Sequence, residues 1–280
     1  MILLTGATGN VGRPLAGLLT EAGLPFRAFA RDPGRARRAL GPEVEIVRGD
    51  LSDPSSLEAA LGGTGVLFLL NGDPALEEDA VDAAARSGVW RVVKLSALAD
   101  GLEPPAFHRR VEESLERTGL GWTHLRPNAF MQTLLGYLPR LISEDEVLRL
   151  PAGGGRIGWV DARDIVAVAF RALTEDGHEG RVYAVTGPEA LSMADVTSEV
   201  ARATGRSVRY EDAPPEEARE RLLAAGLPAT FAGFLIDFYA AVRAGAHDAV
   251  TRDVLEVTGN RPRTFGAFAR EHADAFTVSK

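Results

Sequence analysis

The chain has 280 residues, 45% of them hydrophobic, which is enough to bury the core of one large domain or of a domain with a smaller lobe. Its formal net charge of −8 disfavours contact with phosphate backbones and anionic lipids, so neither nucleic acid nor a membrane is an expected partner. The absence of cysteine excludes disulfides, thiolate metal sites and a cysteine nucleophile.

The five histidines lie far apart in the sequence, none in a metal-binding pair such as HExxH, and no metal site is expected. Met1 leads directly into an apolar segment without a charged leader, and no apolar run approaches membrane-spanning length. We therefore expect neither a signal peptide nor a membrane anchor, and a cytoplasmic location.

The first half of the chain alternates short apolar runs with helical patterns, which is typical of a parallel sheet with crossover helices. Strands are predicted at Ile2–Leu4, Phe26–Ala30, Val44–Val47, Val66–Leu70, Val92–Leu95 and Trp122–Leu125. Helices are predicted at Pro14–Ala22, Pro33–Leu40, Pro54–Leu61, Ala75–Ser87 and Ala106–Thr118, and a glycine follows each of them at or near its end.

The regular alternation of strand and helix patterns ends after Pro127. The pattern predicts a helix at Asn128–Ile142, strands at Val147–Leu150 and Ile157–Val160, a helix at Ala162–Leu173, a strand at Val182–Val185, a helix at Ser192–Thr204, a strand at Val208–Tyr210 and mostly helix from Pro214 on. The predicted fold class is α/β: a Rossmann-type doubly wound parallel sheet with a smaller, mostly helical C-terminal substrate lobe. The expected division is a cofactor domain of residues 1–150, to which 156–186 contribute, and a lobe of residues 187–280.

The most informative motif is the glycine-rich turn TGATGNVG, which lies between the first strand and the first helix. Such a turn presents backbone N–H groups and the positive end of a helix to the pyrophosphate of a dinucleotide. Positive φ is expected at Gly6, close phosphate approach at Gly9 and close packing of helix on strand at Gly12. The residues of this turn expected to bind cofactor are Gly6, Thr8, Gly9, Asn10, Val11 and Gly12.

The tip of the second strand carries Arg31, where NAD-preferring folds have an acidic residue. An arginine there can pair with the 2′-phosphate of NADP(H), and Arg13 and Arg35 could join it. Asp32 places a carboxylate beside this group, and Arg35 also fits an ordinary solvated helix face. The expected cofactor is NADP(H).

Polar residues follow three further strands, at the edge where parallel sheets bind ligands. Asp50 and Leu51 follow the third strand, Leu70 and Asn71 end the fourth, and Ser96 follows the fifth at the nicotinamide end. These five residues are predicted to line the cofactor crevice, although Asp, Asn and Ser also occur there as turn formers.

Several segments, in this order, resemble the NmrA-like group of atypical short-chain dehydrogenase/reductases. The matching segments are TGATGNVG at 5–12, ARDP at 30–33, GDL at 49–51, GLGWTHLRPNAFM at 119–131 and WVDARDI at 159–165. The resemblance implies an NADP-binding fold. Its members include NADPH-dependent quinone reductases, azo- and triphenylmethane-dye reductases, isoflavone-reductase relatives and regulators that bind the cofactor without turnover.

The sequence lacks the Tyr-x-x-x-Lys pair that short-chain dehydrogenases generally carry on the helix after the fifth strand. That helix reads FHRRVEE, and no tyrosine precedes Tyr137. Arg109 is a candidate for the charge-stabilising role of the lysine, and His108 is a candidate proton donor near neutral pH. A solvated helix face is the alternative for both.

Reduction of a quinone-like acceptor suits a site without a tyrosine, because the reduced product is a stable anion that can take its proton from water or a histidine. The candidates for an apolar substrate wall are Phe107, Phe130, Met131 and Trp159, with Phe234 and Tyr239 considered beside them; core packing is the alternative. Asn128 is a candidate for the nicotinamide carboxamide or for a helix N-cap, whereas Asp161 and Asp164 are expected to begin a helix.

The leading hypothesis is an NADPH-dependent reductase of a quinone-like or conjugated small molecule. The alternatives are a non-catalytic NADP(H)-binding redox sensor and a tailoring reductase of aromatic secondary metabolism. A homodimer is left open.

Overall fold

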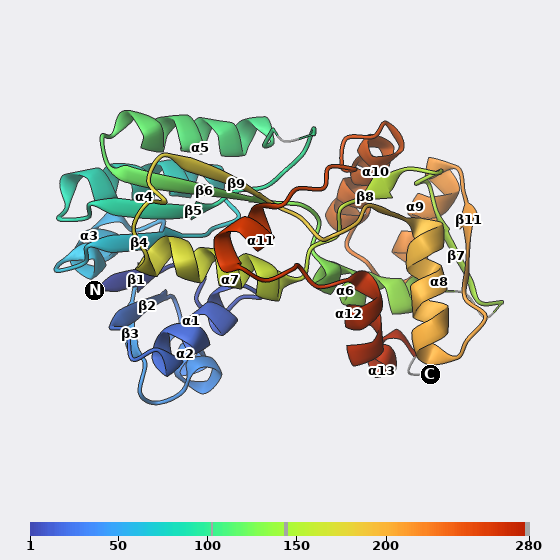
Figure 1. Cartoon of the computed structure of the whole chain (residues 1–280), viewed down its shortest axis with the longest axis horizontal. Helices are drawn as coiled ribbons and strands as arrows, with labels where there is room; N and C mark the ends of the chain where they lie inside the picture. Colours follow the sequence, from blue (N-terminus) through green and yellow to red (C-terminus); the bar gives the residue numbers. More distant parts are fainter. Residues whose placement is uncertain (102, 143–144, 278–280) are drawn as a thin grey trace.

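A computed structural model describes residues 1–101, 103–142 and 145–277 of the chain. Figure 1 shows two bodies, a larger one built on a sheet near the N-terminus and a smaller one that carries the C-terminus. The sheet of the larger body has seven strands in the order β3-β2-β1-β4-β5-β6-β9, and every neighbouring pair is parallel. Its strands are β1 (Ile2–Leu4), β2 (Phe26–Ala30), β3 (Glu45–Arg48), β4 (Val66–Leu69), β5 (Arg91–Leu95), β6 (Gly121–Pro127) and β9 (Arg181–Val185).

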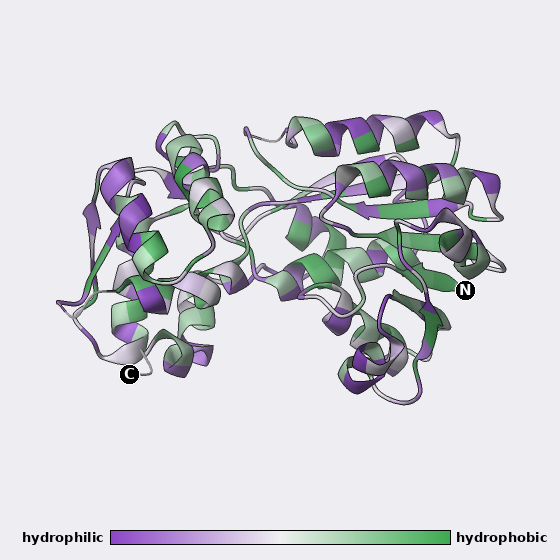
Figure 2. Cartoon of the chain, turned by 180° about the vertical axis from the view of Figure 1, so that it is seen from behind, coloured by the Kyte–Doolittle hydropathy of each residue, from purple (hydrophilic) through white to green (hydrophobic). Residues whose placement is uncertain are grey.

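Helices cover both faces of this sheet. One face packs on α1 (Gly12–Glu21), α2 (Pro33–Leu40), α7 (Ala162–Thr174) and α11 (Asp253–Thr258), and the other on α3 (Pro54–Leu61), α4 (Pro74–Arg86) and α5 (Ala106–Arg117). Successive strand residues point to opposite faces, so Leu4 packs with the first group of helices and Leu3 with the second. Both faces are therefore buried, which explains the apolar strands of the sheet in Figure 2.

Three crossover helices begin at the same signal, an aspartate followed by a proline. Asp32, Asp53 and Asp73 each accept a hydrogen bond from a backbone N–H in the first turn of α2, α3 and α4. The proline fits the first turn because its missing N–H would have no helical partner there. This local signal explains why the sequence predicts the starts of α2 and α3 correctly and that of α4 to within one residue.

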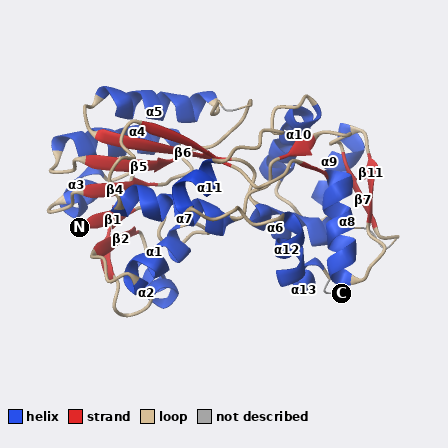
Figure 3. Ribbon diagram, in the orientation of Figure 1, coloured by secondary structure: helices blue, strands red, loops and turns tan. Residues whose placement is uncertain are grey.

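The smaller body has its own core. It contains α6 (Met131–Leu141), α8 (Met193–Thr204), α9 (Pro215–Ala224), α10 (Ala229–Arg243), α12 (Phe265–Glu271) and α13 (Ala273–Phe276), with β7 (Val147–Leu150) paired to β11 (Arg209–Asp212) and β8 (Arg156–Ile157) to β10 (Leu191–Ser192). Figure 3 shows β7 and β11 at the edge of the helical lobe.

The packing divides the chain differently from the boundary at residue 150. Helix α6 and strand β7 pack into the core of the lobe, and α11 returns to the sheet domain through Val254. The partner of β7 is a strand about sixty residues later in the chain, so a local pattern cannot assign it to the lobe.

Two elements between β6 and α7 are also shorter than predicted. Helix α6 begins at Met131 rather than at residue 128, because the backbone before it is extended: Phe130 bridges Val160, and Asn128 N–H donates to Val185. The strand predicted at 157–160 is reduced to Ile157 in β8 and that bridge at Val160. Gly158 lies between them, and a Cβ there would lie 2.4 Å from the Ala249 carbonyl oxygen.

Within the described ranges, no helix is both long and apolar enough to cross a membrane.

Candidate active site

The sheet order reverses between β1 and β4, and the glycine-rich turn lies at the carboxyl end of β1, beside this reversal. Ligands of doubly wound sheets bind in the crevice at such a point. Gly6 has a φ of +61°, as expected, and a Cβ at Gly12 would lie 2.2 Å from the Gly6 carbonyl oxygen. Gly12 therefore packs against the turn itself rather than against the strand.

The start of α1 is open for an anion. Its N-cap residue, Val11, makes no side-chain hydrogen bond, whereas α2, α3 and α4 are each capped by an aspartate. A Cβ at Gly9 would meet only the Gly6 carbonyl oxygen, at 3.3 Å, so no other protein group closes this position. The backbone N–H groups of the turn and the helix dipole fit a pyrophosphate.

A cavity of about 400 Å³ lies beside this turn, between β1, β2 and β4. Of the residues predicted to bind cofactor, it is lined by Gly6, Thr8, Arg31, Asp50, Leu51, Leu70 and Asn71. Arg35 lines it too, whereas Arg13 is not among the lining residues. These residues lie together at one cavity, and their contact with the cofactor stays a prediction.

The carboxylate of Asp32 is committed to the helix behind it. Its Oδ1 accepts the Arg35 backbone N–H at 2.9 Å, and this bond is the main cause that lowers the pKa of Asp32. An aspartate that caps α2 is not oriented as the ribose acceptor of an NAD-binding site, while Arg31 and Arg35 remain at the cavity wall. These two arginines fit the 2′-phosphate of NADP(H).

A second cavity, of about 670 Å³, lies between the sheet domain and the lobe, and Leu70 and Asn71 line both cavities. Its lining includes the other predicted cofactor residues Asn10, Val11, Ser96 and Asn128, the predicted substrate residues Phe107, Phe130 and Trp159, and His108. Helix α10 closes it with Phe234, Leu235, Asp237, Phe238 and Ala241. Gly9, Gly12, Arg109 and Met131 line neither cavity, and Met131 is buried in the core of the lobe.

Asn128 joins the two bodies at this cavity. Its Nδ2 donates to the His247 carbonyl oxygen at 2.9 Å and its Oδ1 accepts the Ala129 backbone N–H at 2.8 Å. It is not an N-cap, because α6 begins three residues later. Asp161, by contrast, caps α7 as expected, and Asp164 on the first turn of α7 binds Arg263.

His108 contacts a buried ion pair that the sequence analysis missed. Its Nδ1 lies 3.3 Å from Lys94 Nζ, which in turn lies 2.6 Å from Glu77 Oε2, and both Lys94 and Glu77 are fully buried. Burial and the charge of Lys94 lower the pKa of His108 to about 4, so the ring is neutral at neutral pH. His108 therefore cannot be the imidazolium acid that its ordinary pKa suggested.

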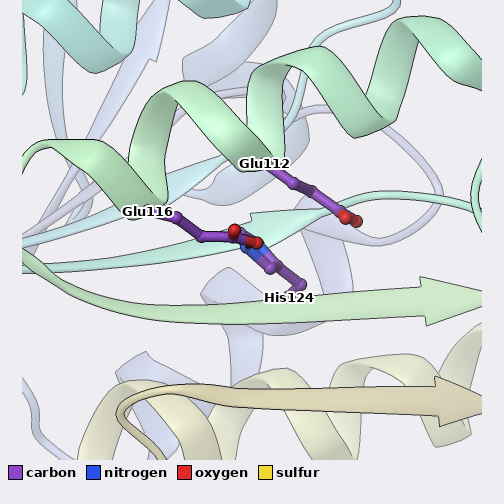
Figure 4. Close-up of side chains that lie close together, drawn as sticks. All are labelled: Glu112, Glu116 and His124. Atoms are coloured by element: carbon purple, nitrogen blue, oxygen red, sulfur yellow. Dashed lines mark hydrogen bonds and ion pairs between the residues drawn. The ribbon is translucent and has the colours of Figure 1, made fainter.

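Arg109 lies in a separate network between α5 and β6. Its guanidinium binds Glu112, Glu113 and Glu116, and these hydrogen bonds raise its pKa. Figure 4 shows Glu112, Glu116 and His124 together, with ligand atoms within 4.8 Å of one another. The carboxylates of this trio are already neutralised, because Arg126 binds Glu112 at 2.7 Å and Arg109 binds both glutamates. Such a set fits an ion-pair network better than a cation site.

Ser96 is held by this network. Its Oγ donates to Glu112 Oε1 at 2.6 Å, and Arg126 Nε donates to the same oxygen at 3.1 Å. Burial alone would raise the pKa of Glu112, but the hydrogen bonds from Arg126 and Ser96 outweigh it and the pKa is lowered. An ionised Glu112 thus fixes the orientation of Ser96 at the cavity wall.

Fold and site define the class: a Rossmann-type dinucleotide-binding protein whose crevice leads from an arginine-bearing cavity to an aromatic one beside the smaller lobe. The chain belongs to the NmrA-like family, whose model matches residues 1–250. A (4-alkanoyl-5-oxo-2,5-dihydrofuran-3-yl)methyl phosphate reductase from Streptomyces griseus is 40% identical over 284 residues, and an NAD(P)H azoreductase from Xenophilus azovorans is 37% identical over 284; each alignment covers 99% of both chains. The NADPH complex of the quinone oxidoreductase QOR2 from Escherichia coli superposes with a TM-score of 0.88 at 25% identity, over 97% of this chain and 99% of that one.

Proposed function

We propose that this chain is an NADPH-dependent reductase that transfers hydride to an uncharged, planar, conjugated acceptor such as a quinone, without a Tyr-x-x-x-Lys pair. The oxidoreductase class and the cofactor rest on the family and on relatives that match over the whole chain. The acceptor class rests on one observation, the aromatic cavity that adjoins the cofactor crevice and carries no cationic side chain among its described lining residues.

The residues present fit NADP(H) along the whole crevice. The uncapped start of α1 would receive the pyrophosphate, Arg31 and Arg35 would hold the 2′-phosphate, and Ser96 and Asn128 would lie near the nicotinamide. NADPH bound in this way supplies the hydride. The protein orients the acceptor against it and keeps the cavity apolar.

The substrate wall is aromatic on both sides. Phe107 and His108 lie on α5 with ring centroids 4.5 Å apart, and Phe234 stacks with Phe238 on α10 at 6.2 Å with an interplanar angle of 20°. Phe107 and Phe234 are 44% and 58% exposed, which is unusual for core residues. Rings held in this way fit a flat conjugated ligand between them.

The charge of the cavity argues against an anionic acceptor. Its described lining contains neither lysine nor arginine, and its one carboxylate is Asp237. A phosphate monoester needs cationic or multiple N–H partners to replace its hydration. We therefore assign this chain an uncharged acceptor, in contrast to the phosphate ester named for its Streptomyces relative.

The proton balance of quinone reduction fits the absence of a Tyr-x-x-x-Lys pair. The acceptor takes up the hydride with its electron pair, negative charge develops on its second carbonyl oxygen, and that oxygen takes a proton from water to give the hydroquinone. Because a phenolate is a far weaker base than an alkoxide, this step does not need a strong acid from the protein.

The test follows absorbance of NADPH with uncharged benzo- and naphthoquinones and with a sulfonated naphthoquinone of the same size. We expect turnover of the uncharged quinones and at least about tenfold lower kcat/KM for the sulfonate, because its charge would have to be desolvated without a cationic partner. Tight binding of NADPH with no oxidation by any acceptor would refute the reductase and favour the sensor instead.

A charge reversal sharpens this test. Asp237→Arg should raise kcat/KM for the sulfonate about fivefold, or about 1 kcal/mol for an exposed charge, and leave uncharged quinones unaffected. Glu220→Arg makes the same charge change on exposed α9 outside the cavity and is the matched control. An equal gain in both variants would assign the effect to net charge and not to the cavity.

A further inference from the structure

The strongest unused feature of the site is the buried pair of Lys94 on β5 and Glu77 on α4. Both side chains are fully buried, although lysine and glutamate are rarely found so. Glu77 is tied on both carboxylate oxygens: Oε1 accepts the Asn71 backbone N–H at 2.8 Å and Oε2 faces Lys94 at 2.6 Å. The pair thus links the Asn71 turn of the crevice to the residue behind His108.

The hydrogen bonds of Lys94 are fully assigned. Its Nζ has three neighbours, Glu77 Oε2 at 2.6 Å, the Leu95 carbonyl oxygen at 3.2 Å and His108 Nδ1 at 3.3 Å. An ammonium group has three protons and no acceptor, so each neighbour receives one of them. His108 Nδ1 must then accept, and the ring proton must be on Nε2.

This assignment does not depend on where the proton of the pair resides. Burial raises the pKa of Glu77 and lowers that of Lys94, since both charges are held away from water, while their mutual attraction opposes both shifts. If Glu77 held the proton, it would donate to the amine lone pair, and the two amine N–H groups would still point to Leu95 and His108.

The other nitrogen of His108 is free to act. His108 lines the aromatic cavity, its side chain is 14% exposed, and Nε2 has no hydrogen-bond partner among the residues that the structure describes. A neutral imidazole with its proton on Nε2 is a donor that stabilises negative charge without carrying a charge of its own.

We infer that Lys94 and Glu77 are positioning residues that hold His108 as the neutral Nε2–H tautomer, so that it donates a hydrogen bond to the acceptor oxygen on which charge develops. The inference rests on the proposed function for the identity of the acceptor. The tautomer itself is a property of the protein without substrate. Its charged neighbours are Lys94 from β5, Glu77 from α4 and Glu112 from its own helix α5, and water supplies the proton that the product finally carries.

The direct test is a long-range ¹H–¹⁵N correlation spectrum of the histidine rings in the full chain with NADP⁺ bound, with His108→Ala assigning the signals. We expect the Nε2–H pattern for His108, unchanged from about pH 5.5 to about pH 8. An Nδ1–H pattern, or titration near the ordinary histidine pKa, would overturn the inference. This measurement needs no variant of the buried pair.

The kinetic test uses the double variant Lys94→Met with Glu77→Gln, in which the amide oxygen introduced at position 77 can still accept the Asn71 backbone N–H. We expect His108 to show both tautomers, kcat to fall about tenfold, KM for NADPH to stay within about twofold, and an acid limb to appear in the pH profile. The matched control is Arg110→Met with Glu78→Gln, which removes an exposed ion pair of 3.6 Å between α5 and α4.

The same double variant made in His108→Ala distinguishes a positioning role of Lys94 and Glu77 from a purely structural one. In His108→Ala, where kcat should be about 100-fold lower, the double variant should cause no further loss. A further loss of about tenfold there would refute the positioning role, and so would an unchanged His108 spectrum in the double variant. If no quinone oxidises NADPH while His108 shows the Nε2–H pattern, the proposed function fails and the tautomer assignment stands.

Discussion

Arg31→Glu is the substitution that tests the cofactor end of the crevice most sharply. Arg31 follows β2 at the wall of the smaller cavity, and Asp32 beside it caps α2. A charge-assisted pair with a phosphate contributes about 2 kcal/mol, and a carboxylate at the same place adds about 1 kcal/mol of repulsion in an exposed setting. The sum of about 3 kcal/mol corresponds to about a 100-fold change in preference.

The assay measures kcat/KM for NADPH and NADH separately, with one quinone at saturation. We expect the ratio of kcat/KM for NADPH to that for NADH to fall about 100-fold, or by less if Arg35 still binds the 2′-phosphate. Part of the change should be a gain in kcat/KM for NADH, because a carboxylate can accept a hydrogen bond from the ribose 2′-hydroxyl. Arg37→Glu makes the same charge change on the exposed side of α2, outside the cavity. A ratio that moves less than about threefold, or equally in both variants, would refute the 2′-phosphate assignment.

Three further substitutions test the frame of the site. Gly9→Val should abolish NADPH binding in calorimetry, because its side chain would occupy the space of the phosphate. The chain should stay folded, because the added Cβ would meet only the Gly6 carbonyl oxygen, at 3.3 Å; normal affinity would exclude this turn as the phosphate site. Gly12→Ala should lower the free energy of unfolding in urea by about 2 kcal/mol, since its Cβ would lie 2.2 Å from that same oxygen; an unchanged midpoint would contradict the close contact. Burial would raise the pKa of Asp161, but the hydrogen bonds of Arg163 outweigh burial, and the pKa is lowered. The ionised carboxylate therefore stabilises the fold above the ordinary pKa of 3.8, and this contribution is lost as the pH falls through the pKa of the folded state. Asp161→Asn should therefore cost about 1–2 kcal/mol at neutral pH and flatten the acid limb of a stability-against-pH curve; parallel curves would reject the assignment.

The sheet domain was predictable because its signals are local. An apolar run, an Asp-Pro start or a terminal glycine identifies each crossover unit within a few residues, and the strand ends then place Arg31, Asp50 and Asn71 at one edge. The lobe was less predictable because its contacts join distant segments. Strand β7 pairs with β11, and Asn128 bonds to His247, 119 residues away.

The role of Lys94 in the site could not be predicted from the local sequence either. In the run VVKL it reads as a strand residue with one charged side chain, and a lysine at a strand is ordinarily placed at a solvated face. Only the packing of α4 and α5 on one face of β5 brings Glu77 and His108 to it. The usable signal was a lone lysine in an otherwise apolar central strand, which requires a buried partner.

The two cavities of the site draw their described residues from different parts of the chain. Every described residue of the smaller cavity belongs to the sheet domain, whereas Phe234, Asp237 and Phe238 reach the larger cavity from α10 of the lobe. The two bodies are tied at the cavity itself, because Gly158 N–H donates to the His247 carbonyl oxygen at 2.9 Å and Asn128 donates to the same oxygen. Changes on α10 can therefore alter the charge and shape offered to the acceptor without moving the phosphate turn or the His108 donor, both of which are held by the sheet. We therefore propose that the residues of α10 adjust the choice of acceptor, whereas the sheet domain sets the choice of cofactor.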